Sequence, residues 1–192
     1  MDALDAIQKR VSVQRVGGKA PDRSQRDAIY AAALRVPDHA QLKPWRFLEI
    51  EGDGLVSLGE LFVEALRANK TESGEEITAR EIVRTKAKPL RAPLVIVVIA
   101  SPKDHPKVPE VEQLLSAGTA AQNILLASHA LSVGAMWRTG GVAYDSIVKA
   151  GLGLKESEHI VGFIYLGEPE GQLRQTPTVA IEEYFQLWPP QT

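Results

Sequence analysis

The sequence predicts a three-layer α+β sandwich, in which helices cover both faces of a central sheet. Two apolar runs, at 94–100 and 159–167, lack polar alternation and therefore predict strands that are covered on both faces. Helical patterns outnumber strand patterns, and they separate the strands in an order that is not strictly alternating. The 192 residues contain no internal repeat or interdomain linker, so one domain over residues 1–192 is expected.

The first half of the chain predicts three helices and one strand. A short amphipathic helix is expected over 2–10, and a second helix begins at Pro21 and reaches about Leu34. A strand over 47–50 stops at a Gly-rich turn, and a third helix follows over 55–68. Residues 69–88 are polar and charge-rich, which predicts an excursion that contains a helix and has a mobile tip.

The second half is dominated by the strongest helical pattern, over 110–131. Its small residues at 116–121 fit either a helix at a subunit interface or a helix buried within the chain. Residues 136–141 form a short apolar entry to a Gly turn, and another helix is expected over 144–150. The tail is too apolar to remain in water, so we expect it to pack on another surface, such as a second subunit. Its large apolar residues are Tyr184, Phe185, Leu187 and Trp188.

The composition is that of a globular protein, with 44% hydrophobic and 24% charged residues. A net charge of −2 gives no reason to expect a nucleic acid or a membrane surface as partner. Basic residues nevertheless recur near the motifs described below, which suits a small anionic ligand. They are Lys9, Arg10, Arg15, Arg35, Lys43, Arg46 and Arg138.

Several kinds of site are excluded or disfavoured by residue counts. The chain has no cysteine, which excludes disulfides, thiol nucleophiles and thiolate metal sites. Its four histidines lack metal-ligand spacing, so no metal is expected. The N-terminus is acidic where a signal peptide is basic, and the longest apolar run, 94–100, is too short to span a membrane. A cytoplasmic, soluble protein is the expectation.

Two sequence blocks carry the functional signal. Residues 35–47 form a polar loop in which Pro37 ends the preceding helical pattern and Pro44 keeps the following backbone extended. The opening block, Lys9-Arg10-Val11-Ser12, closes the first helix. This pairing resembles the FMN-dependent nitroreductase family, whose usual opening is Arg-Arg-Ser and whose second block contains Pro-Trp. The Pro-Asp-His variant here looks most like the small YdjA-like branch. Further blocks at 137–140 and 160–167 extend the resemblance over essentially the whole chain.

The FMN contacts follow partly from chemistry and partly from the resemblance. Guanidinium groups suit a phosphate, which points to Arg10 and Arg138, although Arg10 also fits a cation that complements a helix end. Val11 replaces the usual second Arg of the family. The resemblance implies an FMN set of Arg10, Val11, Ser12, Arg35, His39, Trp137, Arg138 and Thr139. Of these, Arg35 and His39 would come from a second subunit. His39 would act chemically or only by position, and Trp45 would be a pocket wall or plain core.

The nicotinamide cofactor is the second implied ligand. The resemblance assigns it Ala127, Ser128, His129, Ala130, Leu131 and Ser132, a stretch whose own chemistry predicts the last turn of a core helix. Because no Gly-x-Gly-x-x-Gly motif is present, NADH or NADPH is expected to stack on the flavin rather than occupy a Rossmann site.

The resemblance therefore implies a homodimeric FMN oxidoreductase with flavin sites at the subunit interface. NAD(P)H would reduce the flavin, and a nitroaromatic, quinone or related acceptor would then enter the same cleft, a ping-pong mechanism. The fold implied is the nitroreductase-like α/β/α sandwich with a mostly antiparallel (mixed) sheet and a C-terminal segment that packs on the partner subunit. The alternatives are a biosynthetic or dehalogenating flavin enzyme of the same fold, and a non-catalytic FMN-binding protein.

Overall fold

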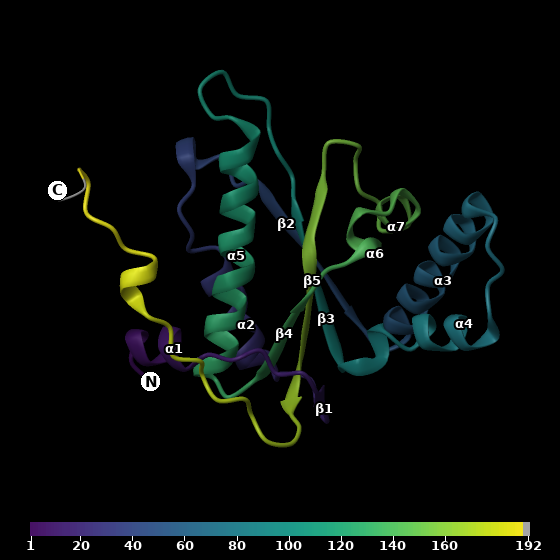
Figure 1. Ribbon diagram of the computed structural model, residues 1–192, viewed down its shortest axis with the longest axis horizontal. Coiled ribbons are helices and arrows are strands. Elements are labelled where there is room, and N and C mark those ends of the chain that lie inside the picture. The colour runs from purple at the N-terminus through teal and green to yellow at the C-terminus, as the bar shows by residue number, and fades with distance from the viewer. Residues whose placement is uncertain (190–192) are drawn as a thin grey trace.

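The computed structural model describes residues 1–189 (Figure 1). Its sheet runs in the order β2-β3-β5, and both β4 and β1 pair with the other side of β5. Every strand pair in residues 1–189 is antiparallel. The strands are β1 (Val16–Gly17), β2 (Trp45–Glu51), β3 (Leu94–Ala100), β4 (Gly134–Arg138) and β5 (His159–Pro169).

Helices cover both faces of this sheet, which confirms the predicted three-layer α+β class (Figure 1). On one face, α2 and α5 pack over Ile96, Val98 and Ile164. On the other face, α3, α6 and α7 cover Val97, Ile99 and Phe163. The helices are α1 (Ala3–Lys9), α2 (Arg23–Ala33), α3 (Asp53–Ser73), α4 (Ala79–Lys86), α5 (Glu110–Ala130), α6 (Gly141–Tyr144) and α7 (Ser146–Gly151). Short 3₁₀ turns lie at His39–Gln41, Pro89–Arg91 and Ile181–Glu183.

The long helix α5 bears on one alternative left open by the sequence. Its small residues Ala117, Ala120 and Ala121 are fully buried against the rest of the same chain. Ala121 packs in the core cluster of that face with Ile124 and Leu125. The three alanines are therefore buried within the chain, whereas Ser116, Gly118 and Thr119 of the same stretch are half-buried or exposed, so a subunit contact of that face stays a prediction.

Local signals fix the ends of several helices. α2 begins with a capping box, in which Asp22 and Gln25 satisfy each other's backbone N–H groups. α3 ends where Gly74 adopts the left-handed conformation with φ of 71°, which a glycine reaches at little cost. Thr78 and Glu81 form a second capping box at the start of α4. These ends hold α3 and α4 as a helical hairpin beside the sheet.

Four details differ from the sequence-based expectation. α3 continues to Ser73, so the first part of the predicted mobile excursion is helical. The apolar entry at 136–141 contains strand β4, and the short strand β1 was not foreseen. The helix expected over 144–150 is two helices, because the side chain of Asp145 accepts from the N–H groups of Ile147 and Val148 and starts α7 anew. No helix within residues 1–189 is long and apolar enough to cross a membrane.

Candidate functional site

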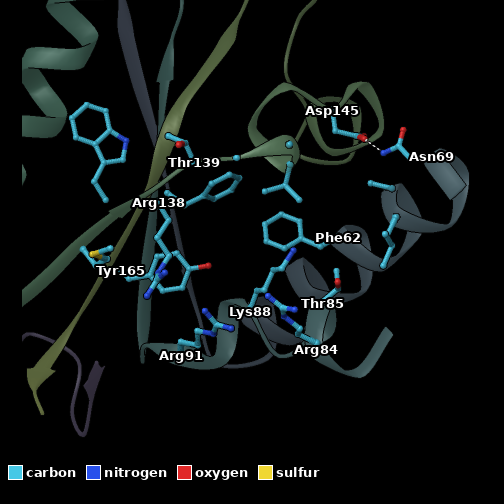
Figure 2. Close-up of a pocket in the computed structure, with 18 residues that line it drawn as sticks. Phe62, Asn69, Arg84, Thr85, Lys88, Arg91, Arg138, Thr139, Asp145 and Tyr165 are labelled. Carbon is cyan, nitrogen blue, oxygen red and sulfur yellow. Dashed lines mark hydrogen bonds between the residues drawn. The ribbon is translucent and has the colours of Figure 1, made fainter. Parts of the chain in front are cut away.

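A cavity of about 670 Å³ lies between the sheet and the α3–α4 hairpin (Figure 2). α3 contributes Phe62 and Asn69, and β5 contributes Phe163 and Tyr165. The rings of Phe62 and Phe163 meet edge to face, with centroids 5.4 Å apart, and form an apolar wall of the cavity. The end of β4 and the turn that follows supply Trp137, Arg138, Thr139 and Gly140.

Strand alternation sorts the side chains of β4 between the two faces of the sheet. Met136 packs against the α3 side, and Trp137 packs against the α2–α5 side, where its Nε1 donates to the carbonyl of Val161 over 3.2 Å. Arg138 is two residues after Met136 and therefore lies on the same face of the sheet. It lies over the ring of Tyr165, with its guanidinium carbon 5.3 Å from the ring centroid. This alternation brings Arg138 into the cavity.

The walls of the cavity are strongly cationic. Arg84, Lys88, Arg91 and Arg138 line it together with a single lining carboxylate, Asp145. Figure 2 shows Arg84, Lys88 and Arg91 along one side, and Asn69 and Asp145 at another. Asn69 donates to the Asp145 carboxylate over 2.7 Å, and this carboxylate also caps α7. Because one carboxylate faces four cations, the lining keeps a net positive charge.

The environment of these groups shifts their pKa values. Partial burial lowers the pKa of Lys88, and the neighbouring charges of Arg84 and Arg91 lower it further. Burial raises the pKa of the Tyr165 hydroxyl, so Tyr165 remains a neutral hydrogen-bond donor. Within residues 1–189 the Nε of Arg138 is buried without a hydrogen-bond partner, while its terminal nitrogen donates to the Gln14 carbonyl over 3.2 Å. Such a site favours an anionic ligand with hydrogen-bond acceptors.

The cavity continues into two smaller hollows. A hollow of about 500 Å³ shares Arg91, Met136 and Arg138 with it and adds Arg15. A third, of about 270 Å³, shares Arg15 and is also lined by Ser12 and Arg174. The three share lining residues along one groove, with cations along its length and one carboxylate, Glu170, in both smaller hollows.

Comparison with known proteins identifies the family. The model of the nitroreductase family matches residues 7–168. The chain belongs to the nitroreductase family. Among curated relatives, "Putative NAD(P)H nitroreductase YdjA" of Escherichia coli K12 is 36% identical over 183 residues, covering 95% of this chain and 96% of the relative. A nitroreductase-like protein of Bacillus cereus has the same fold, with a TM-score of 0.81 at 21% identity and coverage of 98% and 97%.

A third relative is a nitroreductase of Bacteroides fragilis whose crystal structure has bound FMN. It aligns with a TM-score of 0.72 at 21% identity, covering 97% of this chain and 99% of that one. The structural likenesses show that the chain has the nitroreductase fold. The family match and the 36% identical relative show that it is an oxidoreductase of that family.

The nitroreductase groove contains part of the FMN set expected from the sequence. Arg138 and Thr139 line the main cavity, Trp137 borders it although its ring packs on the opposite face of the sheet, and Ser12 lines the third hollow. Val11 is half-buried and lines none of the three. The backbone beyond it is fixed to β4, because the N–H of Val13 donates to the carbonyl of Ala135 over 2.9 Å.

Arg10 and His39 lie near opposite ends of α5. Arg10 ends α1 near His129, whose pKa is lowered by burial and secondarily by the Arg10 charge. His39 lies at the other end, where its Nδ1 is 2.7 Å from a carboxylate oxygen of Glu112. Glu112 and His129 are about 25 Å apart along the helix axis, at 1.5 Å per residue. The two predicted FMN contacts therefore do not converge within one chain.

Arg35 also lies on the α2–α5 side. It follows the end of α2, and its carbonyl accepts from the side chain of Asn123 over 3.1 Å. Neither Arg35 nor His39 lines the cavity of its own chain. Their predicted role toward FMN depends on a second subunit.

The six residues assigned to NAD(P)H form the end of α5 and the turn after it. Ser128 is fully buried and its hydroxyl donates to the Ile124 carbonyl over 2.7 Å. Ser132 has a positive φ of 60°, and the N–H of Val133 returns to the Ser128 carbonyl. None of the six, Ala127, Ser128, His129, Ala130, Leu131 and Ser132, lines the cavity. Their geometry is that of the core-helix end that their own chemistry predicts.

The sequence reasoning missed the cations of the α4 region. Arg84, Lys88 and Arg91 are four and three residues apart, a spacing that places side chains on one side of a helical segment. This pattern begins within the polar excursion at 69–88 and ends three residues beyond it, so it could have been found from the sequence. Tyr165 and Phe62 carried no signal, because each sits in a run that reads as ordinary core.

Proposed function

We propose that the protein is an FMN-dependent oxidoreductase that passes electrons from NAD(P)H to nitroaromatic, quinone or related acceptors. The observation that carries the proposal is the cationic groove, with Arg138 between the main cavity and the hollow that contains Arg15. Membership of the nitroreductase family supports the reaction class.

The residues of the groove fit the parts of FMN. A phosphate of about two negative charges suits Arg15, Arg138 and the hydroxyl of Ser12. Arg10 lines none of the three hollows, and its expected FMN contact would come from the end of α1, two residues before Ser12. The buried, unpaired Nε of Arg138 is a donor without a partner in residues 1–189. Lys88 and the hydroxyl of Tyr165 would serve a flat ring that becomes anionic on reduction.

When bound, the flavin supplies the redox chemistry by accepting a hydride and returning electrons to the acceptor. Arg138 is held for its task by Gln14 and by the face of Tyr165. Phe62 and Phe163 exclude water from one wall, which strengthens the field of Lys88 in the cavity. A single cleft for both donor and acceptor supports a ping-pong order.

We also propose that the active form is a homodimer. Arg35 and His39 would contact the flavin held by the partner subunit. The apolar arm after β5 supports this assembly, since its described residues are exposed in the single chain.

Flavin titration tests the proposal. The protein is expected to bind FMN ten- to hundredfold more tightly than riboflavin, as estimated for one or two charged hydrogen bonds of about 1.5–3 kcal/mol in total. Arg138→Leu should remove most of this preference and leave riboflavin binding nearly unchanged. Arg23→Leu, at an exposed ion pair on α2, is the control and should bind as the parent does.

Equal affinity of the parent protein for FMN and riboflavin would refute the phosphate assignment. Anaerobic addition of NADPH or NADH to the FMN complex should bleach its yellow colour. Colour that persists with both donors would instead indicate a non-catalytic FMN-binding protein.

A further inference from the structure

Arg84 stands apart from the other cations of the groove. It lines the main cavity but not the hollow that contains Arg15, whereas Arg91 and Arg138 line both. Within residues 1–189 its guanidinium has no ion pair. On the α3–α4 hairpin, Glu60 is paired with Lys86, and Glu75 and Glu81 with Lys70, and no carboxylate of the described residues pairs with Arg84. The fold thus holds Arg84 at the cavity with its charge unneutralised.

In the proposed binding mode, neither the phosphate nor the ring of FMN pairs with the Arg84 guanidinium. The phosphate suits the end of the groove with Arg15 and Arg138, and the ring suits Lys88. Arg84 lies beyond them on α4, next to the nearly buried hydroxyl-bearing Thr85. Arg84 and Arg91 both repel the charge of Lys88, so a further anion here would relieve repulsion as well as form hydrogen bonds.

We propose that Arg84 binds an anionic group, a carboxylate, on the oxidised acceptor, so that the protein prefers carboxylate-bearing aromatic acceptors to neutral ones. This inference rests on the proposed function. A planar guanidinium matches a carboxylate with two parallel hydrogen bonds. A small aromatic acid keeps its carboxylate within the cavity that holds its reducible group. The phosphates of NADPH, in contrast, are separated from the nicotinamide ring by at least a ribose.

Equilibrium binding to the oxidised FMN complex gives the first test. 4-Nitrobenzoate and 4-nitrobenzamide share size and reducible group and differ in charge. The parent protein is expected to bind the acid about tenfold more tightly, the low end for a charged hydrogen bond in a partly open site. Arg84→Gln should abolish the preference. Arg80→Gln, one turn away on α4 and outside the cavity, should retain it.

Rapid-mixing kinetics give the second test, because the two half-reactions are separable. Arg84→Gln should slow flavin reoxidation by 4-nitrobenzoate about tenfold, while reoxidation by 4-nitrobenzamide and reduction by NADPH and NADH stay as in the parent.

Equal binding of the acid and the amide by the parent overturns the inference. So does an Arg80→Gln effect as large as that of Arg84→Gln, or an Arg84→Gln defect confined to reduction by NADPH. A protein that bleaches with NADPH and reduces the amide without preferring the acid retains the proposed function and refutes this inference alone. Failure to bind FMN refutes both.

Discussion

At the scale of single residues, Arg46 shows how a cation near the motifs serves the fold instead of the site. Its guanidinium donates two hydrogen bonds of 2.7 Å to the carboxylate of Glu158, whose side chain is 3% exposed. Glu158 also accepts from the N–H of Lys155 over 2.9 Å. The pair ties β2 to the loop that enters β5, and together these bonds lower the pKa of Glu158 to about 2.

Glu158→Gln should destabilise the protein by about 3 kcal/mol, because it removes the charge that compensates a partly buried guanidinium. Urea unfolding at pH 7 measures this. The pKa of Glu158 is lowered from 4.5 to about 2 on folding, so its contribution is complete above pH 4.5 and is lost as pH falls toward 2. The difference between parent and variant should therefore shrink between pH 4.5 and pH 2.

Glu51→Gln is the matched control for that experiment. Glu51 pairs with Arg26 over 2.6 Å, but its side chain is 53% exposed. The Arg26 side chain is only 18% exposed, but it keeps Glu49 as a second carboxylate partner when Glu51 is neutralised. Loss of the exposed Glu51 charge should therefore cost less than about 1 kcal/mol and leave this variant close to the parent. Equal losses for Glu158→Gln and Glu51→Gln would contradict the role of burial.

The family resemblance pointed to Trp137, Arg138 and Thr139, which border the cavity and whose role toward FMN stays a prediction. Residue chemistry and motif order could not tell that Arg138 lines the cavity whereas Arg46 pairs with Glu158. Glu158 lies 112 positions away from Arg46, and the register of β2, β3 and β5 decides that they meet. Long-range pairing of this kind is a property of the folded topology.

At the scale of elements, uninterrupted apolar runs predicted β3 and β5 well, because a strand buried on both faces has no polar alternation to misread. The α3–α4 hairpin was harder to read. Asn69 and Lys70 look like loop residues, but α3 continues through them, and Lys70 is paired with Glu75 and Glu81. The connection between the helices is therefore confined to residues 74–78.

Limited proteolysis should find this connection. Within residues 1–169, a protease specific for glutamate is expected to make its first cut after Glu75 or Glu76, because both are exposed and lie between helix ends. FMN should slow this cut severalfold, since α4 lines the proposed flavin cavity with Arg84 and Thr85. A first cut elsewhere within 1–169 would contradict this map, and an unchanged rate with FMN would contradict the coupling.

At the scale of the whole molecule, exposed apolar surface gathers in the C-terminal arm. Phe185 is 78% exposed and Trp188 is 91% exposed. The arm extends away from the sheet on the side of α5, where α1 also lies (Figure 1). The sequence predicted an apolar tail that needs a partner surface, and the single chain does not supply one to its described residues. Pattern alone could not define the partner surface, because that surface belongs to an assembly.

The length of α5 gives the dimer its sharpest test. Arg10 and His39 lie near opposite ends of this helix, so both can contact one flavin only if they come from different chains. Arg10→Ala and His39→Ala homodimers would each carry one lesion in every site. In mixed dimers, one site carries both lesions and the other carries none.

Co-refolding equal amounts of the two variants should therefore restore about a quarter of the flavin sites, since random mixing makes about half of the dimers mixed. FMN binding by fluorescence quenching and NADPH oxidation both measure the recovery. Each variant refolded alone is the control and must be impaired, and Arg23→Ala mixed with Arg10→Ala calibrates the statistics with an exposed position on α2. If both single variants are impaired and mixing restores no sites, Arg10 and His39 do not serve a shared site, and the composite interface is wrong.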